Sequence, residues 1–209
     1  MRIALVWALA IFVSVIAAAP LAEAACLHYE GIPVVLEGQI SLRTFFGPPN
    51  YGEYPMTDSQ EIQAIVHLQE AICVSADPAD DARAEANQSD VTLVPLRGEN
   101  LNVFDGQTIA VRGKLFHANT GHHHTPVLIQ VERIQRPLNL EIQADGSIVA
   151  AGKSFSADRE LEDFLRDYGA VRIHVLASKG VQYSQVEKAM KAIQASGGAD
   201  VGLVGISTQ

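Results

Sequence analysis

The sequence has few cysteines and few basic residues, and each shortage excludes some classes of protein. Only two cysteines, Cys26 and Cys73, occur in 209 residues, and neither lies in a redox motif. Lysine and arginine number 15 against 24 aspartates and glutamates, which leaves a formal net charge of -9. Because an acidic surface repels phosphate backbones, this composition argues against a nucleic-acid partner.

The sequence also lacks the motifs of hydrolytic and phosphate-transferring enzymes. No Ser/His/Asp order, paired-carboxylate motif or glycine-rich phosphate loop stands out. A histidine-rich segment is present, but no glutamate accompanies it in the pattern of a known metallohydrolase. We therefore expect a protein that is not an enzyme.

The first 25 residues predict export. Arg2 precedes an apolar run over residues 3–19, and the small-residue site Ala22-Glu23-Ala24 follows. This pattern is typical of a cleavable signal peptide at residues 1–25, which would make the mature protein periplasmic. Since the apolar run is close to the length that spans a bilayer, the alternative is an uncleaved anchor in the inner membrane, facing the periplasm. Membrane contact is expected only in that second case.

The two cysteines of an exported chain predict a disulfide. Exported proteins fold in an oxidising compartment, where an even number of cysteines usually pairs. A bond between Cys26 and Cys73 is the one intramolecular bridge that the sequence allows. In the chain-entropy description, closing a loop of this length stabilises the fold by about 4 kcal/mol, which is a structural role.

The remaining chain divides into two expected domains near Arg136-Pro137. Residues 26–135 contain five strand-like segments with one short connection before the fourth, which predicts a small OB-like β-barrel. Residues 137–209 predict a ββαβαβ two-layer sandwich, so the expected class is α+β overall. The expected strands of the barrel are 34–45 with a bend or bulge at Gly38, 62–74, 91–96, 111–117 and 127–131, with an acidic loop over 77–90.

Local signals place the elements of the second domain. A hairpin turns at Asp145-Gly146, and Ser156 is expected to cap a first helix that ends at Gly169. Ser184 and Glu187 are expected to form a capping box at the start of a second helix. His174, on the strand between the helices, is expected to be exposed.

In a barrel of the OB type, the loops after the first and fourth strands bind ligands. The first of these loops is rich in turn-forming and aromatic residues, which either line a groove or cap the core. The candidate ligand-binding residues in this loop are Pro48, Asn50, Tyr51 and Tyr54.

The loop after the fourth expected strand is dense in histidine. Neutral imidazole is a common ligand for zinc, copper or nickel. In an extended backbone His122 and His124 share one face while His123 points away, and His117 enters from the preceding strand. His117, His122 and His124 are therefore candidate metal ligands. The alternative is a solvated turn with a structural role.

Two stretches of the first domain resemble an uncharacterised exported bacterial domain family. The resemblance is carried by residues 47–51 (GPPNY), Cys73 and residues 115–126, which include TGHHHTP. It covers about residues 26–134. It implies export and gives no activity.

Residues 138–207 resemble the periplasmic domain of the ExbD/TolR biopolymer transport family, through 144–146, 173–183, 186–190 and 198–205. In that family the domain is membrane-tethered, dimerises and contacts TonB-like partners or the cell wall, while a transmembrane aspartate couples proton flow to motion. Residues 3–19 contain no acidic residue, so the proton-coupling group is missing. The resemblance implies envelope proteins or the cell wall as partners, a homodimer through this domain, and partner contacts at Lys179 and Tyr183.

These features predict a non-enzymatic binding and interaction protein of the cell envelope, related to energy-transduction components. The alternative function is a periplasmic metal-binding protein that uses His117, His122 and His124. The sequence leaves the ligand and the oligomeric state open.

Overall fold

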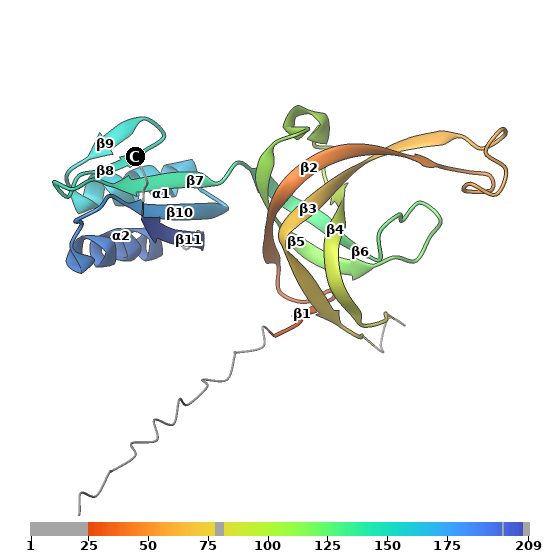
Figure 1. Cartoon of the computed structure of the whole chain (residues 1–209), viewed down its shortest axis with the longest axis horizontal. Coiled ribbons are helices and arrows are strands. Elements are labelled where there is room, and N and C mark those ends of the chain that lie inside the picture. The colour runs from red at the N-terminus through yellow and green to blue at the C-terminus, as the bar shows by residue number, and fades with distance from the viewer. Residues whose placement is uncertain (1–24, 78–81, 198, 207–209) are drawn as a thin grey trace, which may run out of the picture.

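Strands dominate the structure, a computed structural model that describes residues 25–77, 82–197 and 199–206 (Figure 1). Because 49% of the residues lie in strands and 16% in helices, the fold is mostly β rather than α+β. Except for its last residue, the predicted signal segment 1–25 lies outside the described residues. Within the described ranges, neither helix is long and apolar enough to cross a membrane.

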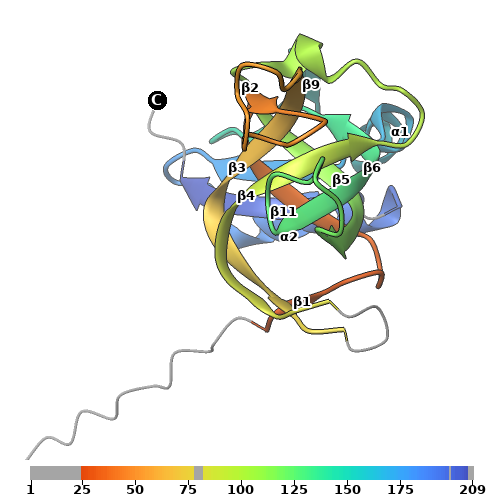
Figure 2. The same ribbon diagram turned by 90° about the vertical axis from the view of Figure 1, so that its right-hand side faces the viewer.

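The first part of the chain forms a closed five-stranded OB-like β-barrel (Figure 2). β2 pairs antiparallel with β3 and β5, β5 pairs with β6, and β3 pairs with β4. A parallel pairing of β4 with β6 completes the ring. The elements are β1 (Leu27–His28), β2 (Val34–Phe46), β3 (Gln60–Ser75), β4 (Glu85–Pro95), the 3-10 helix η1 (Leu101–Phe104), β5 (Thr108–His117) and β6 (Val127–Gln135).

Apolar side chains at alternate strand positions fill the barrel. Burying a valine, leucine or isoleucine side chain contributes roughly 1.5–3 kcal/mol, so this interior is the main source of the barrel's stability. Its fully buried members include Ile40, Val66, Val91, Ile109, Leu115, Ile129 and Val131.

Two glycines allow neighbouring strands of the barrel to approach closely. A Cβ atom on Gly38 would meet the carbonyl oxygen of His67, and one on Gly113 would meet the carbonyl oxygen of Gln130. The pairing through Gly38 is regular, whereas the register of β5 against β6 shifts beside Gly113. The structure therefore has no bulge at Gly38, and the extra residue of this register shift is Glu132 of β6.

Strands β3 and β4 both begin earlier than predicted. β3 starts at Gln60 rather than at residue 62, and β4 starts at Glu85 rather than at residue 91. The second half of the expected acidic loop is therefore strand. Backbone pairing with β3, as at Ile72↔Gln88, extends β4 through residues that lack apolar alternation.

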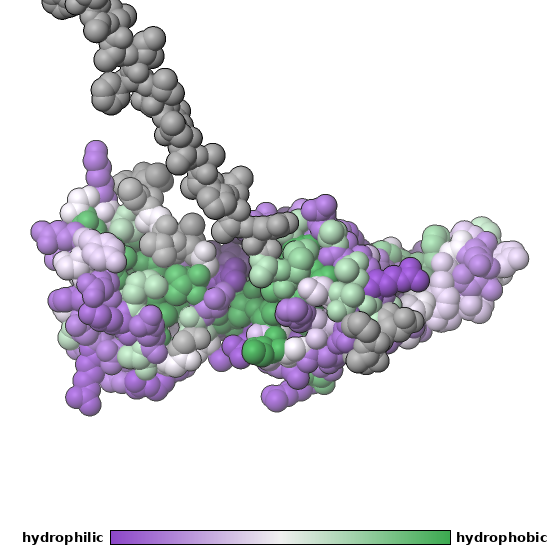
Figure 3. Space-filling view, turned by 90° about the horizontal axis from the view of Figure 1, so that it is seen from below, coloured by the Kyte–Doolittle hydropathy of each residue, from purple (hydrophilic) through white to green (hydrophobic). Residues whose placement is uncertain are grey.

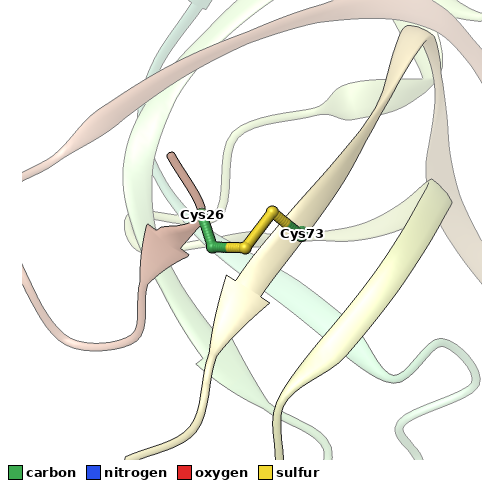
Figure 4. Close-up of a disulfide and its surroundings, with 2 residues drawn as sticks. All are labelled: Cys26 and Cys73. Carbon is green, nitrogen blue, oxygen red and sulfur yellow. A yellow bond between two sulfur atoms is a disulfide. The ribbon is translucent and has the colours of Figure 1, made fainter. Parts of the chain in front are cut away.

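The predicted disulfide between Cys26 and Cys73 is present and attaches the start of the described chain to β3 (Figure 4). The two Cα atoms lie 4.7 Å apart across a sequence separation of 47. β1 is only two residues long and pairs parallel with the end of β3. Because so short a strand has few hydrogen bonds of its own, the covalent bond fixes its position.

Residues 138–206 form a second sheet, with strand order β11-β10-β7-β8-β9, and two helices. The chain order is βββαβαβ, because β9 adds a strand that the expected ββαβαβ lacked. With three residues, β9 is too short to show alternation in the sequence. The elements are β7 (Leu138–Ile142), β8 (Ile148–Ala150), β9 (Lys153–Phe155), α1 (Asp158–Tyr168), β10 (Arg172–Ala177), α2 (Tyr183–Ala195) and β11 (Asp200–Ile206).

Both helices begin differently from the prediction. The N-cap of α1 is Ala157, which makes no side-chain cap, rather than Ser156. The capping box of α2 joins Gln182 and Gln185 rather than Ser184 and Glu187. In both cases the helix starts one or two residues away from the expected cap, and neighbouring polar residues compete for that position.

The two sheets have separate apolar cores and meet at a polar junction. Glu37 of β2, whose side chain is 4% exposed, lies 3.3 Å from Arg172 Nη1 and 2.9 Å from His174 Nε2 of β10. Arg172 also donates to the carbonyl of Val35 and to Asp200. Figure 3 shows hydrophilic residues where the two lobes meet. His174, which was expected to be exposed, therefore takes part in the junction.

Candidate functional site: a groove beside the histidine loop

The loop between β5 and β6, residues 118–126, is called the histidine loop below, and one carboxylate of β3 anchors it. Glu61 Oε2 lies 2.7 Å from His122 Nδ1, and Glu61 Oε1 lies 2.5 Å from His124 Nε2. Burial alone would raise the pKa of Glu61, but the hydrogen bonds from the two imidazoles hold it below its usual range. Glu61 is therefore ionised at neutral pH and accepts from both rings.

Aromatic rings of the β2–β3 hairpin hold the same two imidazoles. Phe45 stacks on His124 with the ring centroids 4.1 Å apart and the planes 4° from parallel. The hydroxyl of Tyr51 lies 3.1 Å from His122 Nε2. The hairpin loop, residues 47–59, projects from the barrel above the histidine loop (Figure 1). The two expected ligand-binding loops therefore support each other.

His123 turns away from this cluster. Its Nδ1 atom accepts from the backbone N–H of Asn119 at 3.0 Å, and its ring stands edge-on to Phe116. Burial, and then the charges of His122 and His124, lower the pKa of His123. A neutral ring agrees with its role as an acceptor.

The three predicted metal ligands do not come together. His117 lies at the end of β5, where its Nε2 atom is 3.4 Å from Glu85 Oε1. His122 and His124 do converge, but each uses a ring nitrogen to bind Glu61. Across residues 25–77, 82–197 and 199–206, no group of three or more His, Cys, Asp or Glu side chains is arranged to hold a metal ion.

The predicted ligand-binding residues of loop 47–59 make internal contacts. Asp58 accepts from the backbone and the side-chain amide of Asn50, both at 3.0 Å, and the Pro48 carbonyl accepts from Ser59. Tyr51 supports His122, and Tyr54 is exposed. These contacts shape the loop itself, and none of the four predicted residues lines the groove described next.

A groove of about 430 Å³ opens beside the histidine loop, where β3 and β4 part. The two strands pair as far as Ile65↔Thr92, and beyond this point β4 pairs with β6 instead. The groove combines apolar side chains of the barrel with amides and imidazoles at its rim. Its lining includes Leu42, Ile62, Ala64, Leu93 and Leu101 of the first kind and Gln63, Asn100, Asn102, His122 and His123 of the second.

Gln63 connects the groove to the histidine loop. Its Nε2 atom donates to the carbonyl of His122 at 2.5 Å. Its Oε1 atom is buried and, in the part of the chain that the structure describes, has no hydrogen-bond partner. The neighbouring Ile62 is 68% exposed. The groove therefore offers an unused acceptor next to an apolar surface.

Sequence reasoning missed Glu61, Phe45 and Gln63. It began the strand at residue 62, which left Glu61 outside the predicted strand. The register of the β2–β3 hairpin sets Phe45 opposite Glu61 and Arg43 opposite Gln63. This long-range pairing has no local sequence signal, so the sequence alone could not have placed Glu61 beside the histidine loop.

The predicted partner-binding residues lie in the second part of the chain. Lys179 is exposed in the connection between β10 and α2, and Tyr183, the first residue of α2, is 81% exposed. Both side chains are therefore accessible, Lys179 on the connection and Tyr183 where α2 begins.

Comparison with known proteins finds one family. A model of a domain of unknown function (DUF4431) matches residues 90–135. The matched segment begins in β4 and contains β5, the histidine loop and β6, but it excludes Glu61 and the second sheet. No curated protein matches the chain. The segment from residue 90 to residue 135 is thus similar to a family whose description gives no activity.

Proposed function

We propose that this chain is a non-enzymatic binding protein of the cell envelope, whose barrel holds a polysaccharide strand in the groove between β3 and β4. One observation carries the proposal, namely the place of the groove on the barrel. It lies on the second and third barrel strands, beside the loop between the fourth and fifth. In OB barrels this face and its flanking loops bind oligonucleotides and oligosaccharides.

Charge and lining favour a sugar polymer over a nucleic acid. The chain carries a formal charge of -9, and among the described lining residues there is no lysine or arginine to bind phosphate. The amides of Gln63 and Asn102 can exchange hydrogen bonds with hydroxyl groups. Ile62 offers an apolar surface to the face of a sugar ring. Neutral hydroxylated rings match both properties.

The second sheet and its helices serve, in this proposal, as an interaction module similar to the ExbD/TolR periplasmic domain. The resemblance of residues 138–207 and the exposure of Lys179 and Tyr183 support this role. The partner is an envelope protein or a second copy of the chain in the periplasm. Light scattering of the mature protein tests self-association, and a strict monomer at high concentration would exclude the second copy.

Co-sedimentation with purified cell-wall sacculi tests the groove. We expect the double variant Ile62→Ala, Asn102→Ala to bind about tenfold more weakly than the wild type, because about 1.4 kcal/mol of contact energy is lost. Both side chains are exposed, so the fold should persist. The matched control is Val103→Ala, Asn139→Ala, which changes two exposed residues of similar kinds outside the groove. Equal sedimentation of wild type and groove variant, or none of either, would contradict the proposal.

Metal binding at the histidine loop is a second candidate, favoured by the convergence of His122 and His124 on Glu61. Two imidazoles and a carboxylate suit zinc, copper or nickel if the metal replaces the two hydrogen bonds to Glu61. Calorimetric titration of these three metals into wild type and a His122→Ala, His124→Ala variant tests it. Heat from the wild type alone supports metal binding, and equal heats or no heat argue for a structural loop.

A further inference from the structure

A second cavity, of about 880 Å³, opens at the base of the histidine loop and shares no lining residue with the groove. Segments far apart in the sequence enclose it: the residues after β1, the start of β4 and the end of β5. Charged groups of both signs meet there. The lining residues that matter below are Tyr29, Glu30, Arg83, Glu85, Phe116 and His117.

Tyr29 lines this cavity and has a buried hydroxyl group. The residue is 5% exposed and belongs to the barrel core, and its hydroxyl has no hydrogen-bond partner among the residues that the structure describes. Burial, and then the neighbouring Glu85 carboxylate, raises the pKa of Tyr29 to about 12. The hydroxyl is therefore protonated at neutral pH. A buried donor without an acceptor is unfavourable, so it marks a place where an acceptor is expected to bind.

The contact between His117 and Glu85, beside Tyr29, also keeps unused bonding capacity. His117 Nε2 and Glu85 Oε1 are 3.4 Å apart, beyond the range of about 2.7–3.2 Å that is usual for a hydrogen bond. Their side chains are 23% and 21% exposed, so water screens them only in part. The ring of Tyr29 stands edge-on to His117 with the centroids 5.7 Å apart. Three incompletely bonded groups therefore converge in one cavity.

We infer that this cavity is a second binding site, which takes a free α-amino acid or a short peptide in its zwitterionic form. The ligand carboxylate accepts from the Tyr29 hydroxyl and the Arg83 guanidinium, and its ammonium group donates to Glu85 and Glu30. Phe116 provides an apolar wall for the ligand side chain. A ligand with a single charge would leave groups of one sign without a partner. The volume lies within the range of roughly 300–1,000 Å³ that is usual for small-molecule sites.

Calorimetric titration of the mature protein with glycine, L-alanine and L-alanyl-L-alanine tests the inference. Sodium acetate and ethylamine serve as probes that carry only one of the two charges. We expect heat from the zwitterions and none from the single charges. Equal binding of acetate or ethylamine, or no binding of any zwitterion at millimolar concentration, would overturn the inference.

The variant Tyr29→Phe tests the hydroxyl itself. The phenylalanine keeps the ring contact with His117, and the loss of a hydroxyl without a partner should leave the melting temperature unchanged or higher. Affinity for L-alanyl-L-alanine should fall about tenfold, as one hydrogen bond is lost. Tyr168→Phe, at an exposed tyrosine of α1 outside both cavities, is the matched control and should bind as the wild type does. Undiminished affinity in Tyr29→Phe would refute the assignment.

The groove variant separates this inference from the proposed function. Ile62→Ala, Asn102→Ala changes no residue of the second cavity and should bind the dipeptide normally. Loss of dipeptide binding in this variant would show that the groove and the second cavity are not independent sites. Failure of the wild type to bind sacculi, with its dipeptide binding intact, would count against the groove alone.

Discussion

Asp90 is a single carboxylate that joins three strands of the barrel. Its Oδ2 atom lies 2.5 Å from Arg43 Nη1 of β2, and its Oδ1 atom lies 2.7 Å from His67 Nδ1 of β3. The hydrogen bond from Arg43, assisted by His67 and opposed by burial, holds the pKa of Asp90 below its usual range. A carboxyl group with a lowered folded-state pKa stabilises the fold above the unfolded-state value, about 3.9, and this stability is lost as the pH falls through the folded-state value.

We expect Asp90→Asn to lower the melting temperature by about 2 °C at pH 7, because a partly exposed pair contributes about 0.2–1 kcal/mol. The difference should vanish towards pH 2, where the wild-type carboxyl is protonated. Thermal unfolding followed by circular dichroism between pH 7 and pH 2 measures the difference in melting temperature at both ends of this range. Asp163→Asn, at the exposed pair with Arg166, is the control. The same loss at every pH would mean that packing, and not ionisation, is affected.

At the residue scale, the sequence predicts the direction in which a side chain points better than it predicts the residue that this side chain contacts. Alternation along an extended chain separates His123 from His122 and His124, and the structure shows this separation. The residue that holds these two rings, Glu61, lies about sixty positions away. Its approach depends on the register of β3 against β2, which no local pattern contains.

The elements of the barrel were predicted well at their centres and poorly at their ends. Each long strand contains a stretch that alternates between apolar and polar residues, because one face of the strand is buried and the other is exposed. The ends follow backbone pairing instead, as in the early start of β4 at Glu85. The OB-like order and the disulfide were correctly predicted, because five strands and two cysteines leave few alternatives. β9 was missed because a strand of three residues is too short to show an alternating pattern of apolar and polar residues.

The disulfide permits a prediction for β1. Replacing both Cys26 and Cys73 with serine should lower the free energy of unfolding by about 4 kcal/mol, since a loop spanning 47 positions is no longer closed in the unfolded chain. Urea unfolding of the oxidised wild type and the double variant measures the change. The thiol titre of the denatured, unreduced wild type should be zero. Equal stabilities would show that β1 contributes little to the barrel.

At the scale of the whole molecule, Glu37 joins the two sheets. The junction was not predicted, since Glu37 lies on an alternating strand and its partners lie in β10, more than 130 positions later. Sequence periodicity describes each sheet separately. Which face of one sheet meets the other is decided by single buried polar groups that no period reveals.

We expect Glu37→Ala to loosen the junction, because Arg172 and His174 lose a buried partner, and removal of one member of such a pair costs about 3–5 kcal/mol. Small-angle scattering should show a larger radius of gyration. Calorimetry should resolve separate melting of the two sheets. Glu70→Ala, at an exposed glutamate of β3, is the control and should behave as the wild type does. An unchanged radius would show that other contacts fix the arrangement.

If the chain is exported, as proposed, the order of strands around the barrel limits when the barrel can close. A translocated chain emerges with its N-terminus first, so β1, β2 and β3 reach the far side together and the Cys26–Cys73 bond can form early. The ring cannot close until β6 arrives, because β6 is the strand that joins β4 to β5. During this interval the edges of β4 and β5 that β6 later covers are open to other chains. Translocation that stalls between residues 75 and 135 would therefore release the form most prone to aggregate and most easily cut by envelope proteases.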